Sequence, residues 1–223
     1  MKKILGLILL VSAFQAEAAS HEYITNGGFE AGNFTGWNVT TNNPFSNWVI
    51  NNGSVVPVFG IPHTPISGAF DALATQSGSS IHSLFQTFTL DTTFSSAIFS
   101  WSDRIYNTNV TGQGYVDPTQ EFRAVVYNSV GTLISSAFST NPGDALTQNG
   151  PNNRSFDLTS ILLGYAGQSI RVGFENSVNL YFMPVYLDNV SFRTTSNLVP
   201  EPASLALLGL GFAGMRLIRR KAT

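Results

Sequence analysis

The chain contains no cysteine among its 223 residues. It therefore forms no disulfide framework, and it offers neither a thiolate metal site nor a cysteine nucleophile. Many exported domains depend on disulfides for their stability. A chain without them must instead be stabilised by its hydrophobic core or by a bound ion.

Basic residues are scarce in the central part of the chain. All three lysines lie in the two terminal segments, and the region from Ala19 to Ser196 contains five arginines and eleven acidic residues, a net charge of −6. Proteins that bind nucleic acid neutralise its phosphates with clusters of lysine and arginine. We therefore expect no nucleic-acid partner.

Catalytic signature motifs are absent from the sequence. It has no G-x-S-x-G nucleophile elbow, no H-E-x-x-H zinc motif and no glycine-rich phosphate loop. Its three histidines are too scattered for a metal site. We therefore expect a protein that is not an enzyme. The alternative is an enzyme that acts on polysaccharide with Asp103, Asp117 or Glu121 as acid and base, since paired carboxylates hydrolyse glycosidic bonds.

Extended helical periodicity is also missing from the region between Ser20 and Ser196. Apolar and β-branched runs there are separated by Asn, Gly, Pro and Ser, a pattern that predicts an all-β, two-sheet sandwich of one domain. We expect a hairpin connection at residues 127–131 and a brief helical turn within residues 157–168. The predicted strands cover residues 47–59, 80–90, 96–106, 121–127, 132–139, 169–174 and 186–192.

The N-terminal sequence, "MKKILGLILLVSAFQAEAAS", has the parts of a secretory signal peptide. Two lysines precede an apolar stretch, and Ala16 and Ala18 form a small-residue cleavage site. We predict that residues 1–18 form the signal peptide, that signal peptidase cuts after Ala18, and that residues 19–196 form the exported sandwich domain.

The C-terminal segment, residues 197–223, contains a short apolar run followed by basic residues. Residues 204–218, 15 in number, would form a helix of about 22 Å, whereas the hydrocarbon core of a bilayer is about 30 Å thick. The cluster Arg219, Arg220 and Lys221 would hold this end on the cytoplasmic side. The length predicts a transient membrane contact, and the alternative is a permanent anchor that keeps the protein tethered to the membrane.

The order of features in this segment resembles a known signal. Val199, Pro200, Glu201 and Pro202, followed by the apolar helix and the basic cluster, are similar to the PEP-CTERM sorting signal of Gram-negative bacteria that produce exopolysaccharide. The resemblance implies recognition by the membrane enzyme exosortase, which removes the tail during export. It also implies a location at the cell surface or in the extracellular matrix.

Two stretches of the central region resemble a second family. "ITNGGFEAGNFTGWNVT", residues 24–40, is similar to the opening segment, and "YLDNVSF", residues 186–192, to the closing strand, of the galactose-binding-like jelly rolls found among carbohydrate-binding modules. The resemblance implies a non-catalytic jelly-roll sandwich with extracellular polysaccharide as a partner.

The first and last strands of such a jelly roll lie side by side, which would bring Glu30 close to Asp188. Two carboxylates at short range repel, and a hard cation that is bound by them and by loop carbonyls removes that cost. We therefore expect a structural Ca²⁺ site at Glu30 and Asp188 with carbonyls from residues 26–28, an ion that related modules hold. The alternative is that each carboxylate accepts hydrogen bonds from backbone N–H groups of a loop.

Aromatic residues beside polar loops are the candidates for ligand contact. Sugars stack their apolar C–H faces on aromatic rings, while polar side chains bind their hydroxyl groups. Most aromatic residues of the chain are expected to lie in the core. The three that we predict to bind ligand are Trp48, Tyr106 and Tyr115.

Overall fold

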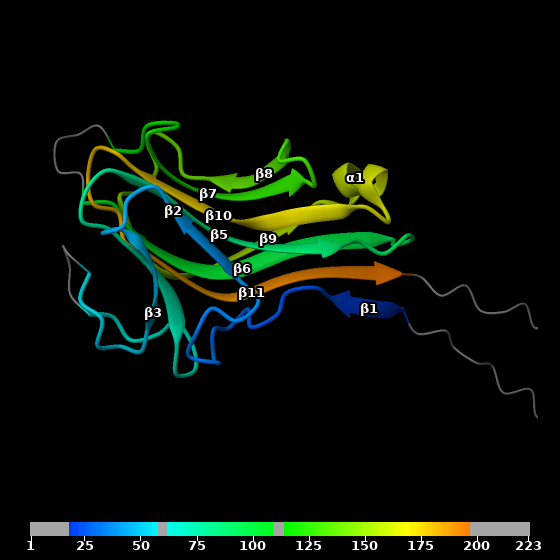
Figure 1. The fold of residues 1–223 in the computed structure, drawn as a ribbon, viewed down its shortest axis with the longest axis horizontal. Helices are drawn as coiled ribbons and strands as arrows, with labels where there is room; N and C mark the ends of the chain where they lie inside the picture. The colour runs from blue at the N-terminus through cyan, green and yellow to red at the C-terminus, as the bar shows by residue number, and fades with distance from the viewer. Residues whose placement is uncertain (1–17, 58–61, 109–113, 197–223) are drawn as a thin grey trace, which may run out of the picture. The chain divides into compact units, whose positions relative to one another are not determined.

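Two antiparallel sheets face each other in the unit formed by Ser20–Ser196 (Figure 1). The structure is a computed structural model, and it describes residues 18–57, 62–108 and 114–196. The all-β, two-sheet sandwich predicted from the sequence is confirmed. The predicted helices that flank it lie outside the described residues.

The first sheet, sheet A, has six strands. Five of them follow the order β3-β4-β11-β6-β9, and β1 pairs with β11. The strands of sheet A are β1 (Ala19–Glu22), β3 (Asn47–Asn51), β4 (Asp71–Thr75), β6 (Ser96–Tyr106), β9 (Thr147–Asp157) and β11 (Val185–Ser196).

The second sheet, sheet B, has five strands in the order β2-β5-β10-β7-β8. A short helix, α1 (Thr159–Leu162), and a 3-10 turn (Leu163–Tyr165) connect β9 to β10. The strands of sheet B are β2 (Asn38–Thr41), β5 (Ser80–Thr89), β7 (Gln120–Asn128), β8 (Leu133–Ser139) and β10 (Ser169–Val178).

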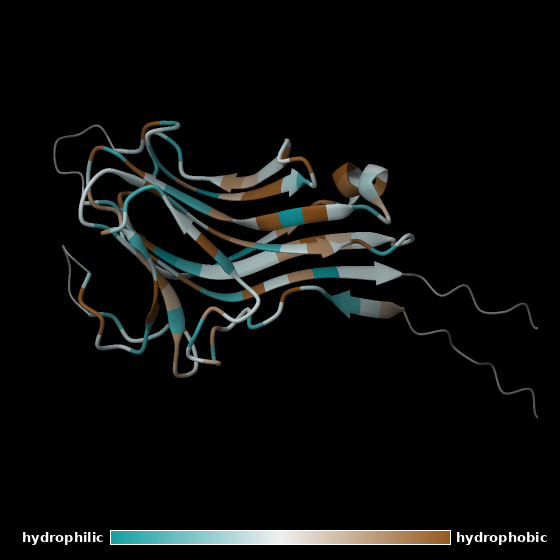
Figure 2. Cartoon of the chain, in the orientation of Figure 1, coloured by the Kyte–Doolittle hydropathy of each residue, from teal (hydrophilic) through white to brown (hydrophobic). Residues whose placement is uncertain are grey.

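The core lies between the sheets and is rich in aromatic rings. Because successive strand residues point to opposite faces, one face of each sheet supplies apolar side chains; hydrophobic and hydrophilic positions follow one another along β10 in Figure 2. Phe122 and Phe174 of sheet B stack at 5.8 Å. Phe174 also contacts Phe99 of sheet A at 5.5 Å and Trp101 at 5.2 Å, so ring contacts join the two layers.

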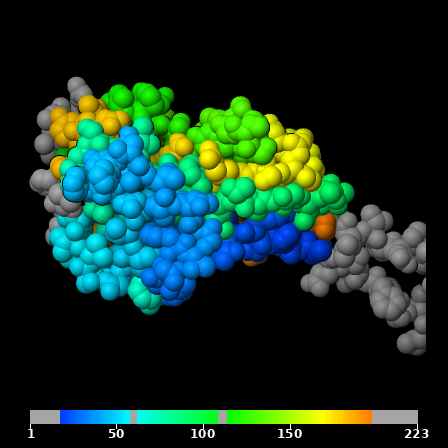
Figure 3. Space-filling view, in the orientation of Figure 1, coloured from blue at the N-terminus to red at the C-terminus, as the bar shows by residue number. Residues whose placement is uncertain are grey.

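The strand β11 pairs with three strands of sheet A, namely β1, β4 and β6. It pairs with β6 along most of its length but with β4 only through Val185–Leu187, and its register shifts between Asp188 and Ser191. At this bulge the N–H of Val190 donates to the carbonyl of Gly27 at 2.9 Å. The segment around Gly27 therefore packs beside the last strand. The N-terminal loops, blue to cyan, form much of the face seen in Figure 3.

All seven predicted strands are present; β6 has the predicted ends, and the ends of the others differ. The predicted strand at residues 47–59 ends at Asn51, and those beginning at Ser169 and near Tyr186 extend further toward the C-terminus. The hairpin is also present, with the N–H of Asn128 donating to the carbonyl of Thr132. The strands that the sequence does not predict are β1, β2, β4 and β9.

Candidate functional site

The predicted signals at the two ends of the chain lie outside the described residues. This applies to the sorting-signal residues 199–202 and 219–221 and to the signal peptide up to Glu17. Within the described part of the chain, no helix is both long enough and apolar enough to cross a bilayer.

Two of the three aromatic residues predicted to bind ligand are buried. Trp48 in β3 is 2% exposed, and its ring meets His82 edge-on at 6.1 Å. Tyr115 is fully buried, and its hydroxyl donates to the carbonyl of Ala145 at 3.1 Å. These rings are in the core because burial of large apolar area outweighs their single polar atom. The expectation of exposed rings at these two positions is thus corrected, since neither has a face at the surface.

Tyr106, the third predicted residue, ends β6 and is partly buried. Its ring stacks on His63 at 4.7 Å and meets Tyr186 edge-on at 6.0 Å. Burial raises the pKa of Tyr106 and lowers the pKa of His63, with the positive charge of Arg104 adding to the lowering of His63. The ring therefore belongs to an aromatic cluster on sheet A.

Glu30 and Asp188, the predicted calcium ligands, lie near one another. Asp188 Oδ1 and Glu30 Cγ lie 3.6 and 3.8 Å from where a β-carbon on Gly28 would stand. Burial raises the pKa of Asp188, and the negative charge of Glu30 raises it further. The two carboxylates thus influence each other electrostatically.

Both carboxylates also accept hydrogen bonds from one loop. The backbone N–H and the hydroxyl of Ser67 donate to Asp188 Oδ2 at 2.8 and 2.7 Å. The N–H of Ala69 donates to both carboxylate oxygens of Glu30 at 3.1 Å. Gly68 between them has φ +58°, and a β-carbon there would lie 2.1 Å from Glu30 Oε1, so only glycine fits. The loop-binding arrangement that the sequence left as an alternative is therefore present.

A third acid, Asp71, completes this cluster. Asn51 Nδ2 and the N–H of Ile66 donate to its carboxylate at 2.8 and 2.9 Å. Burial, with a contribution from the charge of Asp188, raises the pKa of Asp71 to about 6. Carboxylate oxygens keep further lone pairs for a hard cation. Among the described residues, no group of three His, Cys, Asp or Glu side chains forms a metal site, so Ca²⁺ here would also require the loop carbonyls of residues 26–28.

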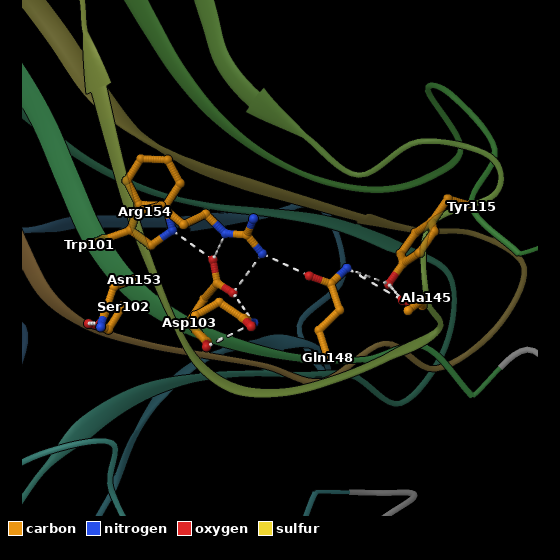
Figure 4. A network of polar contacts seen from close by, with 9 residues as sticks. Trp101, Ser102, Asp103, Tyr115, Ala145, Gln148, Asn153 and Arg154 are labelled. Carbon is orange, nitrogen blue, oxygen red and sulfur yellow. Dashed lines mark hydrogen bonds and ion pairs between the residues drawn. The ribbon is translucent and has the colours of Figure 1, made fainter.

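Asp103, a candidate for acid–base catalysis, is bound in a buried ion pair (Figure 4). Its carboxylate is fully buried and pairs with Arg154 through both oxygens. The indole N–H of Trp101 and Asn152 Nδ2 donate to it at 2.8 and 2.9 Å. The guanidinium of Arg154 also lies 3.9 Å above the centre of the Phe138 ring. These contacts join β6 to β9 and leave the carboxylate inaccessible to a substrate.

Glu121, another candidate acid, lies in β7 of sheet B and belongs to a different network from Asp103. Ser139 Oγ donates to Glu121 at 3.0 Å, and Arg123 lies 3.5 Å from it. Burial raises the pKa of Glu121, and the charge of Asp117 also raises it. Asp117 and Glu121 therefore influence each other, and Asp103 belongs to a separate network.

The outer surface of sheet B carries a cluster of aromatic and charged side chains that the sequence does not single out. Alternate residues of the same strands, including Leu84, Val172 and Phe174, belong to the core. The intervening residues therefore point to the opposite side of the sheet. We call this surface the sheet B face, and its residues are Phe85, Arg123, Val125, Tyr127, Arg171, Gly173 and Glu175.

Gly173 allows the ring of Phe85 to lie across β10. Gly173 is opposite Phe85 on one side and Val125 on the other. A β-carbon on Gly173 would lie 2.5 Å from Phe85 Cδ1 and 2.1 Å from the carbonyl oxygen of Leu84. Only glycine leaves space for this approach. Phe85 is consequently 6% exposed although it points away from the core.

Arg171 lies against two aromatic rings of the sheet B face. Its guanidinium carbon is 4.7 Å from the ring centre of Phe85 and 4.9 Å from that of Tyr127. The two rings are 6.0 Å apart at 74°. A cation is attracted to the negative faces of such rings. Arg171 Nε is buried and makes no hydrogen bond.

Glu175 connects the remaining polar groups of the face. The hydroxyl of Tyr127 donates to Glu175 Oε1 at 2.9 Å, and Arg123 Nε donates to Oε2 at 2.6 Å. Burial and the charge of Glu175 together raise the pKa of Tyr127. Each of these side chains is thus fixed by its neighbours on adjacent strands.

Comparison with known proteins identifies the C-terminal segment. Residues 198–221 match the PEP-CTERM protein-sorting motif. The chain therefore ends in the sorting signal that its sequence resembles, and this signal implies export to the cell surface and processing by an exosortase. No curated protein sequence matches the chain.

Several solved structures are similar to the sandwich. TmCBM61 in complex with beta-1,4-galactotriose has a TM-score of 0.47 at 14% identity, covering 80% of this chain and 99% of that chain. The K3 adhesin domain of Lys-gingipain from Porphyromonas gingivalis w83 has a TM-score of 0.48 at 14% identity, with 78% and 99% covered. The Stig cyclase Fisc from Fischerella sp. TAU has a TM-score of 0.47 at 17% identity, with 82% and 100% covered.

Proposed function

We propose that this chain is an exported, non-catalytic component of the extracellular polysaccharide matrix and that it binds glycan through the sheet B face. The observation that carries the proposal is the fixed cluster of Arg171, Tyr127 and Glu175 around Phe85. It combines the partly buried ring of Tyr127 with hydrogen-bonding groups, and sugar ligands require this composition.

The rigidity of the cluster supports a binding role. Tyr127, Glu175 and Arg123 already hold one another at hydrogen-bond distances. A ligand that binds to side chains in fixed positions does not have to order them, and this lowers the entropic cost of association. Regular strands, rather than a loop, carry all of these residues.

The arrangement of the acids supports a role without catalysis. Asp103 is buried in its pair with Arg154, Glu121 is 2% exposed and lies 3.5 Å from Arg123, and Glu175 is paired with Arg123. A glycosidase needs two carboxyl groups placed on either side of the scissile bond, one of them protonated. Permanently paired carboxylates serve better to orient a ligand than to transfer a proton.

The sorting signal supports the proposed location. A PEP-CTERM motif at residues 198–221 directs the chain to exosortase. Removal of the tail would release the sandwich into the matrix, where polysaccharide is the abundant partner. A retained tail would instead leave the same glycan-binding sandwich tethered to the membrane.

A glycan array followed by a reducing-end assay tests this function. We expect the full chain, purified in mild detergent, to be retained on a subset of polysaccharides without releasing sugar. The Glu175→Gln variant should bind the same glycans more weakly. The matched control is Glu22→Gln, which removes an arginine-paired carboxylate from sheet A and should leave binding unchanged. Release of reducing ends would contradict the non-catalytic role.

A further inference from the structure

We propose that the sheet B face selects acidic polysaccharides, with Arg171 binding a ligand carboxylate. This inference rests on the proposed glycan-binding function and adds the class of sugar. The feature that suggests it is an arginine that has neither an ion pair nor a hydrogen bond with the described part of the protein.

The five arginines of the sandwich differ in their partners. Arg123, Arg154 and Arg193 form ion pairs with glutamate or aspartate, and Arg104 donates to the carbonyl of Thr64. Arg171 has neither an ion pair nor a hydrogen bond with any residue that the structure describes. Its charge is therefore available to a ligand.

The two rings determine which part of Arg171 is available. Phe85 and Tyr127 lie against the guanidinium and restrict its orientation. Because Phe85 is only 6% exposed, its ring offers little stacking area to a neutral sugar. Because Arg171 Nε is buried, the two terminal nitrogens are the donors that remain, and their N–H groups can pair end-on with the two oxygens of a carboxylate.

The neighbouring groups suit a sugar acid. Thr87 is directly opposite Arg171 on β5 and is exposed, so its hydroxyl is placed to bind a sugar hydroxyl. The acidic side chains on this surface do not oppose an anionic ligand strongly. Glu175 is neutralised by Arg123 at 2.6 Å, and Glu121 is 2% exposed and bonded to Ser139.

The test compares ligands that differ only in the carboxylate. The full chain is titrated with polygalacturonate and with alginate, and with carboxyl-reduced forms of both, in which each carboxylate has become a neutral hydroxymethyl group. We expect the wild type to bind at least one acidic form about tenfold more tightly than its reduced form, since charge-assisted hydrogen bonds are about twice as strong as neutral ones. Raising the salt concentration should reduce this preference.

Variants of Arg171 test whether this residue causes the preference for acidic polysaccharide. Arg171→Gln should remove the preference for the acidic form and leave weaker binding to both forms. Arg171→Lys keeps the charge but not the fork, and it should keep part of the preference. The matched control is Arg193→Gln on sheet A, an exposed arginine paired with Glu22, which should behave as the wild type.

The outcomes separate the two proposals. Equal binding of the wild type to the acidic and reduced forms would overturn the acid selectivity and leave the glycan-binding function in place. A preference that survives in Arg171→Gln would also overturn it. Absence of binding to every polysaccharide would overturn both. Near-ultraviolet circular dichroism establishes that each variant is folded, and the wild-type comparison needs no variant.

Discussion

At the level of single residues, the position of the Phe85 ring on the sheet B face depends on the absence of a side chain at Gly173. Gly173 lies where a β-carbon would meet the Leu84 carbonyl and the Phe85 ring within 2.5 Å. We predict that Gly173→Ala lowers the free energy of unfolding by about 1–3 kcal/mol, the usual cost of overpacking. Urea unfolding measures it. Gly164→Ala is the control because nothing lies within 4 Å of its β-carbon position, and an equal loss in both variants would contradict the argument.

A buried histidine makes the stability depend on pH. Burial lowers the pKa of His82 to about 4, and its ring contacts Ser80 and Asn176 at 3.2 Å. In the unfolded chain a histidine titrates near 6.5. The stability that neutral His82 provides is therefore fully present above about pH 6.5, and it is lost as the pH falls through about 4.

The size of this dependence follows from the two pKa values. We compare the free energy of unfolding of the wild type with that of His82→Gln. We predict that the advantage of the wild type is about 3 kcal/mol larger at pH 7 than at pH 4. Asp71 acts in the opposite direction, since its raised pKa of about 6 provides stability at low pH that is lost as the pH rises through 6. Its contribution is common to both proteins and cancels in the difference. A difference that is independent of pH would contradict the burial of His82.

The proposed binding residues show why the sequence predicts the sheet B face poorly. Trp48 and Tyr115 stand beside polar loops in the sequence, yet large rings gain more from the core than from the surface. Arg171, by contrast, occupies an alternating polar position of "RVGFE" that is ordinarily just solvated. The only sequence signal for the sheet B face is that alternation, which places Arg171, Gly173 and Glu175 on one side. The partners of these residues come from strands distant in the sequence.

At the scale of elements, the edge strand β9 depends on a buried ion pair with β6. Removing Arg154 would leave the Asp103 carboxylate charged and buried. We predict that Arg154→Met lowers the free energy of unfolding by about 3–5 kcal/mol. Arg193→Met breaks a largely exposed pair with Glu22 and should cost less than about 1 kcal/mol. Chemical denaturation measures the free energy of unfolding of both variants. Similar losses of stability would contradict a stabilisation of β9 by the buried ion pair.

The same strand shows the limit of prediction from hydrophobic patterns. Strands such as β6 and β10 are predictable because their apolar residues alternate. The sequence of β9, "TQNGPNNRSFD", has almost no apolar residue and includes glycine and proline. It becomes a strand through backbone pairing with β6 and through Arg154. Both are tertiary contacts that local sequence does not contain.

The predicted calcium site beside the loop at residues 66–70 can be tested by adding Ca²⁺. If Ca²⁺ binds at Glu30 and Asp188, adding it at a hundredfold excess over Kd should stabilise the chain by about 2.7 kcal/mol and raise its Tm. Glu30→Gln should lose this response, whereas Glu22→Gln should keep it. An unchanged wild-type Tm would leave the carboxylates with their loop-binding role alone, through the N–H groups of Ser67 and Ala69.

For the whole molecule, the C-terminal sorting motif implies export of the sandwich. The motif at residues 198–221 implies processing by exosortase. We predict that the intact mass of the secreted protein lacks residues 1–18 and the basic cluster at 219–221. Mass spectrometry of the culture supernatant and of the membrane fraction measures this. A mature protein that still carries Lys221 would contradict removal of the tail.

Hydroxyl-radical footprinting can locate glycan binding on the sheet B face. The full chain would be labelled with and without a polysaccharide that it retains. We expect that the ligand protects Tyr127 of the sheet B face and leaves the labelling of Tyr106 on sheet A unchanged. Protection at Tyr106, with Tyr127 labelled equally in both samples, would contradict glycan binding on the sheet B face.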